Sequence, residues 1–123
     1  MSHYPLLWKF RLLRAIHAKG GIQNRRLLAA WGRAEGGTAL YNPLNTTQEW
    51  PGAGTYNKVG VKDYPSGAAG IAATAATLVN GHYDGLVADL RAGRKSAVQM
   101  VSDNRAEIQT WGTNPDTILQ VLA

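Results

Sequence analysis

The residue best placed for acid–base chemistry is a glutamate at the end of a predicted amphipathic helix over residues 24–35. At about 100° per residue, Glu35 lies about 20° from Leu28 and about 40° from Trp31 around the helix axis. Arg33 lies nearly opposite, on the side that faces solvent. The sequence therefore places a carboxyl group on the side of the helix that packs into the core.

A carboxyl group in this position suits general acid catalysis. Partial desolvation in apolar surroundings disfavours the charged form of such a group. The negative end of the helix dipole acts in the same direction, because the glutamate lies in the last turn, directly before Gly36-Gly37. A carboxyl group that keeps its proton near neutral pH can protonate the oxygen of a glycosidic bond. The alternative interpretation is a structural acid paired with a lysine or arginine.

A second carboxyl group is usual in glycoside hydrolysis, and its distance from the first distinguishes retaining from inverting enzymes. Of the eight acidic residues, only Glu49 and Asp63 fall in residues 38–65, the turn-rich middle of the chain. Either could position a water molecule or stabilise an oxocarbenium-like state, and either could equally be a surface acid. If neither takes part, Glu35 must act first as acid and then as base. The sugar's own 6-hydroxyl would then attack and form a 1,6-anhydro product.

Other kinds of active site are not indicated. His3, His17 and His82 are far apart in the sequence and lack the spacing of metal ligands, so we expect no metal and no other cofactor. The chain has no cysteine, which excludes disulfides and thiol chemistry. It also lacks a glycine-rich phosphate loop and the Gly-x-Ser-x-Gly turn of many serine hydrolases.

Capping residues and glycines mark the ends of the predicted helices. Pro5 suits a first helical position, Asn24 can cap the second helix, and Ser66 and Asn114 can cap two later helices. The predicted helices cover residues 5–18, 24–35, 67–80, 83–92, 94–103 and 115–122. The helix over 67–80 is rich in alanine, glycine and threonine. We expect it to be the central buried helix, because small side chains let neighbouring helices approach closely.

Residues 38–65 differ in character from both flanks. They combine turn formers such as Asn42-Pro43 with strand formers, namely Tyr56, Val59, Val61 and Tyr64. The fold class is therefore predicted as mainly α, or α+β with a small β lobe. With 123 residues, of which 45% are hydrophobic, the chain is expected to form one domain. Its parts are N-terminal helices (1–37), the β lobe (38–65) and a helical body (66–123).

The segment AEGGTALYNPLNTT, from Ala34 to Thr47, resembles the active-site segment of lysozyme-like peptidoglycan-cleaving domains. The resemblance is strongest to phage endolysins and virion-associated lysins. The segment is also similar to bacterial glucosaminidases and lytic transglycosylases, in which a glutamate at a helix end precedes a glycine-rich turn and an Asn-Pro turn. The resemblance continues through residues 56–66, Asn80-Gly81-His82-Tyr83 and Trp111-Gly112-Thr113, and covers about residues 24 to 115.

The resemblance implies a lysozyme-like fold, in which a helical body and a small β lobe flank a groove for a glycan strand. It implies that Glu35 is the catalytic acid. The implied substrate-binding residues are Asn45, Thr46, Thr47, Tyr56, Tyr64 and Tyr83. Asparagine and threonine offer donors and acceptors for sugar hydroxyl and N-acetyl groups, and aromatic rings stack on sugars. The alternatives are turn chemistry for the asparagine and threonines, and core packing for Tyr64 and Tyr83.

The function implied is cleavage of the β-1,4 bonds between N-acetylmuramic acid and N-acetylglucosamine. The partner is then the glycan strand of bacterial peptidoglycan, and no cofactor is needed. The alternative is a non-catalytic structural or wall-binding virion domain that kept a lysozyme-like fold. We expect a monomer, or one domain of a larger lysin.

The net charge of +5 favours anionic partners, which include bacterial wall polymers. A basic N-terminal region could suit nucleic acid, but solvated helix faces explain it, so we expect no nucleic-acid partner. Apolar runs are too short to span a bilayer. Because the N-terminal charges are interleaved with apolar residues, we expect no signal peptide. The expected location is the host cytoplasm and then the cell wall, as a phage-encoded protein, or the virion.

Overall fold

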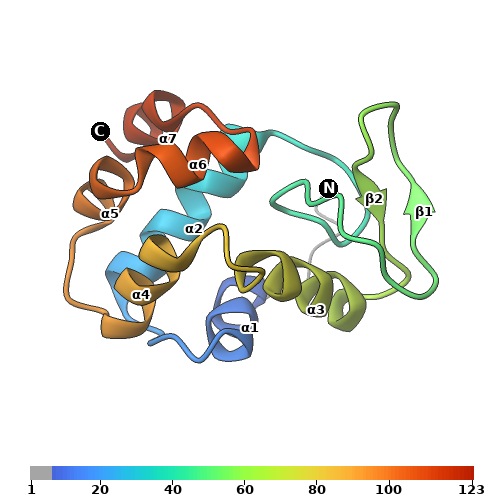
Figure 1. Ribbon diagram of the computed structural model, residues 1–123, viewed down its shortest axis with the longest axis horizontal. Coiled ribbons are helices and arrows are strands. Elements are labelled where there is room, and N and C mark those ends of the chain that lie inside the picture. Colours follow the sequence, from blue (N-terminus) through green and yellow to red (C-terminus); the bar gives the residue numbers. More distant parts are fainter. Residues whose placement is uncertain (1–6) are drawn as a thin grey trace.

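The computed structural model describes residues 7–123, which form a mainly helical protein with a small two-stranded sheet (Figure 1). The predicted fold class, mainly α with a minor β part, is confirmed at this level. The helices are α1 (Trp8–Ala15), α2 (Ile22–Glu35), α3 (Gly67–Leu78), α4 (Asp84–Ala92), α5 (Ala97–Asp103), α6 (Arg105–Trp111) and α7 (Pro115–Leu122). The strands are β1 (Gly54–Thr55) and β2 (Lys62–Asp63). No helix within residues 7–123 has the length and apolar character needed to cross a bilayer.

Helix α2 is the centre of the helical body, where it packs against α1, α5 and α7 (Figure 1). Its side chains Leu27, Leu28 and Trp31 are fully buried. The expectation that α3 would be the central helix was wrong. The small side chains of α3 serve a different purpose, because Gly70 lies directly against the backbone carbonyl of Tyr41 in the lobe. Close approach at Gly70 thus docks the lobe onto the body, while α3 also packs against α1.

Most predicted helix ends are confirmed, but one cap is wrong. Gly36 ends α2 in the left-handed conformation (φ 57°), and the Ser66 hydroxyl accepts from the backbone of Ala69 at the start of α3. Asn114 caps α7. Asn24, however, lies inside α2 and is buried, and its amide donates to the carbonyls of Lys19 and Leu90. Because α2 begins at Ile22, two residues before Asn24, this residue lies within the first turn and not at the cap position, which Gly21 occupies.

Several helix boundaries shift. The predicted helix over 5–18 ends at Ala15, before His17 with its positive φ of 59°, and its predicted start at Pro5 lies outside the described residues, as does His3. Helix α5 starts later than predicted because Ser96 caps it, accepting from Gln99 at 3.1 Å. Helix α6 was not predicted, since no glycine or proline marks the break at Asn104 that separates it from α5.

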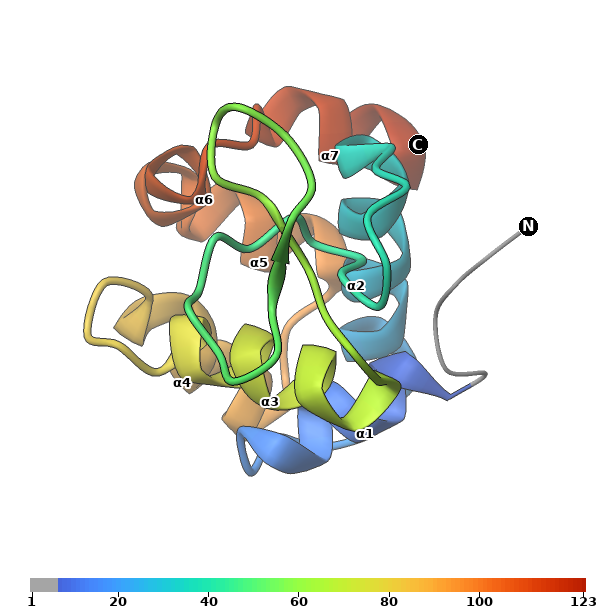
Figure 2. The same cartoon turned by 90° about the vertical axis from the view of Figure 1, so that its right-hand side faces the viewer.

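The lobe is mostly loop. Strands β1 and β2 pair antiparallel over two residues each, so the predicted strand formers Tyr56, Val59, Val61 and Tyr64 lie outside them. In the absence of a larger sheet among the described residues, the buried side chain of Asn42 holds this part of the lobe together by hydrogen bonds. It accepts from the backbone N–H of Thr46 and donates to the carbonyls of Thr46 and Lys62. These bonds close the 42–46 loop onto β2. Figure 2 looks onto the lobe, with α3 on one side and α6 and α7 on the other.

Candidate active site

Glu35 ends α2 on its core-facing side, as predicted from the helical period. Leu28 and Trp31 on the same side are fully buried, Arg33 is exposed, and Glu35 itself is half-buried. The Thr113 hydroxyl donates a hydrogen bond to the carboxylate oxygen Oε1. The other oxygen, Oε2, accepts from the side-chain amide of Asn45 at 3.1 Å. Each oxygen of the carboxyl group is therefore held by a neutral donor.

The buried indole of Trp31 supports this arrangement through a hydrogen bond to Thr113. The Nε1–H of Trp31 donates to the hydroxyl oxygen of Thr113 at 3.0 Å. Trp31 is 0% exposed and Thr113 is 7% exposed. Thr113 follows α6, where its backbone N–H bonds to the carbonyl of Ile108. The sequence indicated Thr113 only through the family resemblance and not as a partner of Glu35. Residues 78 positions apart share no local pattern that could reveal such a pair.

Two backbone features bring Asn45 to the glutamate. Asn45 adopts a left-handed conformation (φ 57°), which asparagine tolerates better than most residues. A Cβ at Gly37 would lie 2.2 Å from the side-chain oxygen of Asn45, so only glycine leaves room for the amide there. The double glycine after Glu35 therefore has two separate uses. Gly36 ends the helix, and Gly37 admits Asn45.

The ion-pair alternative for Glu35 is wrong for the part of the chain that the structure describes. The ion pairs found between residue 7 and residue 123 join Lys62 to Glu49, Lys95 to Asp89 and Asp103, and Arg105 to Asp116. None involves Glu35. The carboxyl group is thus held by hydrogen bonds without a neighbouring cation to neutralise its charge.

A small polar cavity of about 130 Å³ lies beside Asn45. Its lining residues are Asn45, Thr46, Thr47, Thr77, Tyr83, Thr110 and Trp111. The structure therefore brings together four of the predicted substrate-binding residues, and it adds two threonines and a tryptophan that the sequence did not indicate for binding. The hydroxyls of Thr46 and Thr77 bond to each other at 2.6 Å. The ring of Tyr83 meets Trp111 edge-on, with centroids 5.2 Å apart.

The other predicted tyrosines lie elsewhere. Tyr64 is 1% exposed and donates to the carbonyl of Gln48 at 2.6 Å, so it is a core residue. Burial, with a smaller contribution from the charge of Glu49, raises the pKa of Tyr64 to about 12. Tyr56 is exposed, and its hydroxyl shares a 2.5 Å hydrogen bond with Thr38. Tyr56 thus ties the hairpin to the turn that follows α2.

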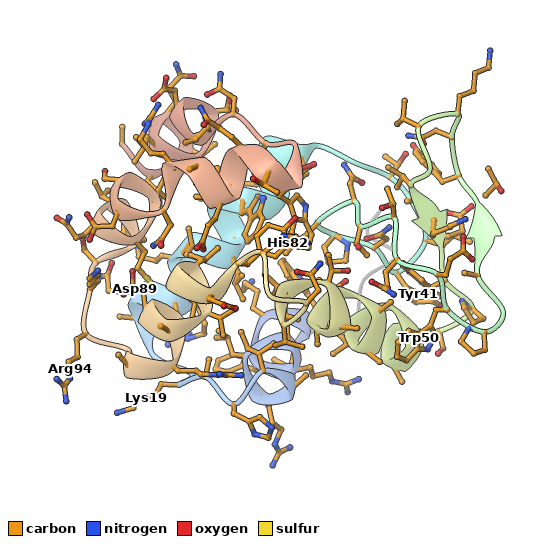
Figure 3. All side chains as sticks on the ribbon, viewed as in Figure 1. Lys19, Tyr41, Trp50, His82, Asp89 and Arg94 are labelled. Carbon is orange, nitrogen blue, oxygen red and sulfur yellow. The ribbon has the colours of Figure 1, made fainter. Side chains whose placement is uncertain are left out.

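Tyr83 lines the cavity and is also packed into the core, with 6% of its surface exposed. Burial raises its pKa, and the negative charge of Glu107 adds to the effect. The neighbouring His82 is exposed and lies between α3 and α4, while Tyr41 and Trp50 lie on the lobe (Figure 3). His82 does not line the cavity.

The two acids proposed as second carboxyl groups both have other partners. The side chain of Glu49 is 83% exposed and pairs with Lys62 at 2.8 Å. Asp63, in β2, accepts a hydrogen bond from the backbone N–H of Leu40 at 2.7 Å. This contact clamps the segment after α2 to the hairpin. Neither acid shares a hydrogen-bond partner with Glu35.

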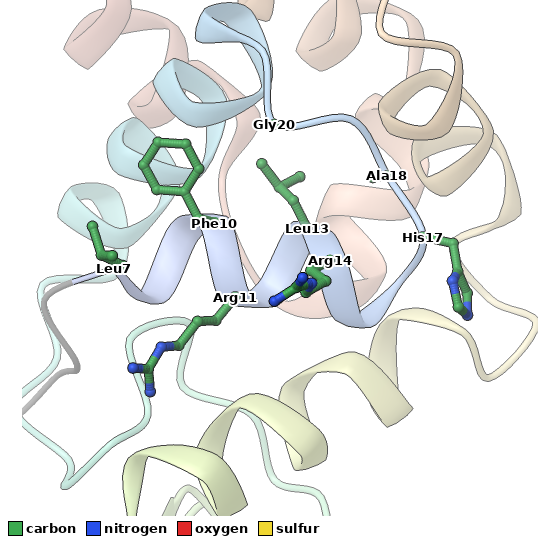
Figure 4. Close-up of a pocket in the computed structure, with 8 residues that line it drawn as sticks. All are labelled: Leu7, Phe10, Arg11, Leu13, Arg14, His17, Ala18 and Gly20. Carbon is green, nitrogen blue, oxygen red and sulfur yellow. The ribbon is translucent and has the colours of Figure 1, made fainter.

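A larger, open depression of about 670 Å³ runs along α1 (Figure 4). It combines exposed apolar side chains, Leu7 and Phe10, with the basic residues Arg11, Arg14 and His17. No carboxyl group lines it. The depression therefore offers a surface for contact but no acid for catalysis.

Between residues 7 and 123, no three histidine or acidic side chains gather in a way that could hold a metal ion. Comparisons with models of protein families, with curated proteins and with solved structures found no match.

Proposed function

We propose that this chain is a lysozyme-like glycosidase that cleaves the β-1,4 bonds of peptidoglycan, with Glu35 as its general acid. One observation carries the proposal: a half-buried carboxyl group ends a core helix and is held by two neutral donors, one of which, Asn45, lines a polar cavity. No cation in the described chain neutralises it. The arrangement of a helical body with a small lobe also supports a lysozyme-like architecture.

The two donors to Glu35 suit a residue that loses a proton during the reaction. As Glu35 protonates the glycosidic oxygen, negative charge develops on Oε1 and Oε2. The Thr113 hydroxyl and the Asn45 amide already point at these two atoms. Donors that bind developing charge more strongly than the neutral acid lower the barrier to bond cleavage.

The cavity suits a substituent of an N-acetylated sugar. Its volume of about 130 Å³ has room for a side group such as an acetamido group. Threonine hydroxyls offer donors and acceptors, and the rings of Tyr83 and Trp111 offer an apolar wall. The net charge of +5 favours approach to an anionic cell wall.

We propose that Glu35 is the only carboxyl group in the chemical step. Asp63 is occupied by a backbone N–H and Glu49 by a lysine. After giving its proton to the leaving oxygen, Glu35 would take a proton from the incoming hydroxyl as that hydroxyl bonds to the anomeric carbon. The incoming group is either water, which gives a reducing end, or the sugar's own 6-hydroxyl, which gives a 1,6-anhydro end.

The experiment is fragment analysis by mass spectrometry after the purified protein is incubated with peptidoglycan from several bacteria. We expect the unmodified chain to release glycan fragments, and Glu35→Gln to fold and bind the wall but release none. Asp84→Asn is the matched control, because Asp84 is exposed and its substitution also removes one negative charge. Reducing ends on muramic acid or on glucosamine, or anhydro ends, identify the bond and the route.

Two results would contradict the proposal. If the unmodified chain releases no fragment from any wall tested, the non-catalytic wall-binding alternative is correct. If Glu35→Gln cleaves as fast as the unmodified chain, another residue is the acid.

A further inference from the structure

The hydrogen bonds run in one direction, from Trp31 to Thr113 and from Thr113 to Glu35. An indole N–H is a donor and never an acceptor, so the Thr113 oxygen must accept from Trp31. A threonine hydroxyl has one hydrogen, which then points at Oε1 of Glu35. Because Trp31 is fully buried and Thr113 nearly so, the protein itself sets this direction.

This direction makes the two oxygens of Glu35 unequal. A proton on Oε1 in line with Thr113 would displace the hydroxyl hydrogen from the acceptor it has in the fold, whereas a proton on Oε2 leaves the bonds from Trp31 to Thr113 and from Thr113 to Oε1 in place. Oε2 faces the amide of Asn45, a residue that also lines the polar cavity. Oε1 is therefore held as an acceptor by Thr113, and Oε2 is the oxygen whose partner, Asn45, lines the cavity.

We infer that Trp31 and Thr113 are positioning residues that keep the transferable proton of Glu35 on Oε2. The inference rests on the proposed function for its catalytic meaning. The direction of the hydrogen bonds is a property of the folded chain and can be tested without substrate. Neither residue touches the sugar in this scheme, since both act through the glutamate.

The first test uses the Trp31 indole as a reporter in a ¹⁵N-labelled protein followed by NMR over a pH titration. Hydrogen bonds in a chain polarise one another, so ionisation of Glu35 strengthens the bond from Thr113 and then the bond from Trp31. Trp31→Phe assigns the signal.

We expect the Trp31 indole proton to move downfield with a single inflection as pH rises. The movement should vanish in Glu35→Gln and in Thr113→Val, and Trp50 on the lobe should not follow it. If the Trp31 indole proton still moves with pH in Glu35→Gln, the inference is overturned.

The second test compares kcat and KM on soluble peptidoglycan fragments. Thr113→Val keeps the side-chain shape without the hydroxyl, and we expect it to lower kcat by about 100-fold with little change in KM. Thr113→Ser retains the hydroxyl and should restore most of the activity. The double variant Trp31→Phe with Thr113→Val should be no slower than Thr113→Val alone, because Trp31 acts only through Thr113.

The two proposals fail in distinguishable ways. If the unmodified chain is active and Thr113→Val leaves kcat unchanged, the inference is refuted and the glycosidase proposal remains. An inactive chain sinks the glycosidase proposal, while the titration of Trp31 still decides whether the polarised hydrogen bonds exist. The dispersion of the NMR spectrum shows in each case whether a variant has folded.

Discussion

Substituting Gly70 by alanine tests whether close backbone contact docks the lobe onto the helical body. Gly70 lies inside α3, where alanine is normally preferred by about 1 kcal/mol. Here a Cβ would lie 1.8 Å from the carbonyl oxygen of Tyr41 and 3.0 Å from its carbonyl carbon. Since contacts under 3.0 Å are essentially never seen, α3 and the loop must part by about 1 Å. The two effects therefore oppose each other, and the geometry predicts that the clash wins.

The expected result is a net loss of stability. Overpacking typically costs about 1–3 kcal/mol, and both partners here are constrained, α3 by its helix and Tyr41 by a positive φ of 54°. For a chain of this size, 1 kcal/mol corresponds to a shift in Tm of about 3–5 °C. The loop that carries Tyr41 continues to Asn45, so the displacement should also weaken the contact between Asn45 and Glu35.

The assay is thermal unfolding followed by circular dichroism. Gly54→Ala is the control, because a Cβ at that position meets no atom within 4 Å. We expect Gly54→Ala to stay within about 0.5 kcal/mol of the unmodified chain. If Gly70→Ala unfolds at the same or a higher temperature, helix propensity has outweighed the contact. The docking argument would then be refuted.

Two further predictions concern the lobe. Because the pKa of Tyr64 is raised to about 12, its contribution to stability is complete below about pH 10 and is lost as pH rises towards 12. Denaturant titrations between pH 9 and 12 should show a loss of about 2–3 kcal/mol in the free energy of unfolding. Tyr64→Phe should remove that pH dependence, and it should cost about 1 kcal/mol of stability because the hydrogen bond to Gln48 is lost. Asp63→Asn should cost about 1 kcal/mol through its bond to Leu40 yet still release wall fragments. A folded Asp63→Asn protein that releases none would make Asp63 the second carboxyl group.

The sequence alone determined the features that depend on local periodicity and capping. The helical repeat places Glu35 beside Leu28 and Trp31 on the core side of α2, whatever the helix packs against. Gly36 ends that helix because its left-handed conformation suits glycine, and Ser66 begins α3 for an equally local reason. These features arise between residues only a few positions apart, so a local sequence pattern is enough to predict them.

Tertiary structure alone decided what surrounds the glutamate. Thr113 reaches Glu35 from 78 positions away, and Thr77 and Trp111 join the cavity from separate helices. The wrongly predicted helix cap at Asn24 has the same cause, because the side-chain amide of Asn24 bonds to the distant carbonyl of Leu90. A hydrogen bond between distant segments depends on how helices pack, and no local pattern records that packing. The position of Glu35 was thus visible in the sequence, while the direction of the hydrogen bonds that hold its carboxyl group became visible only in the fold.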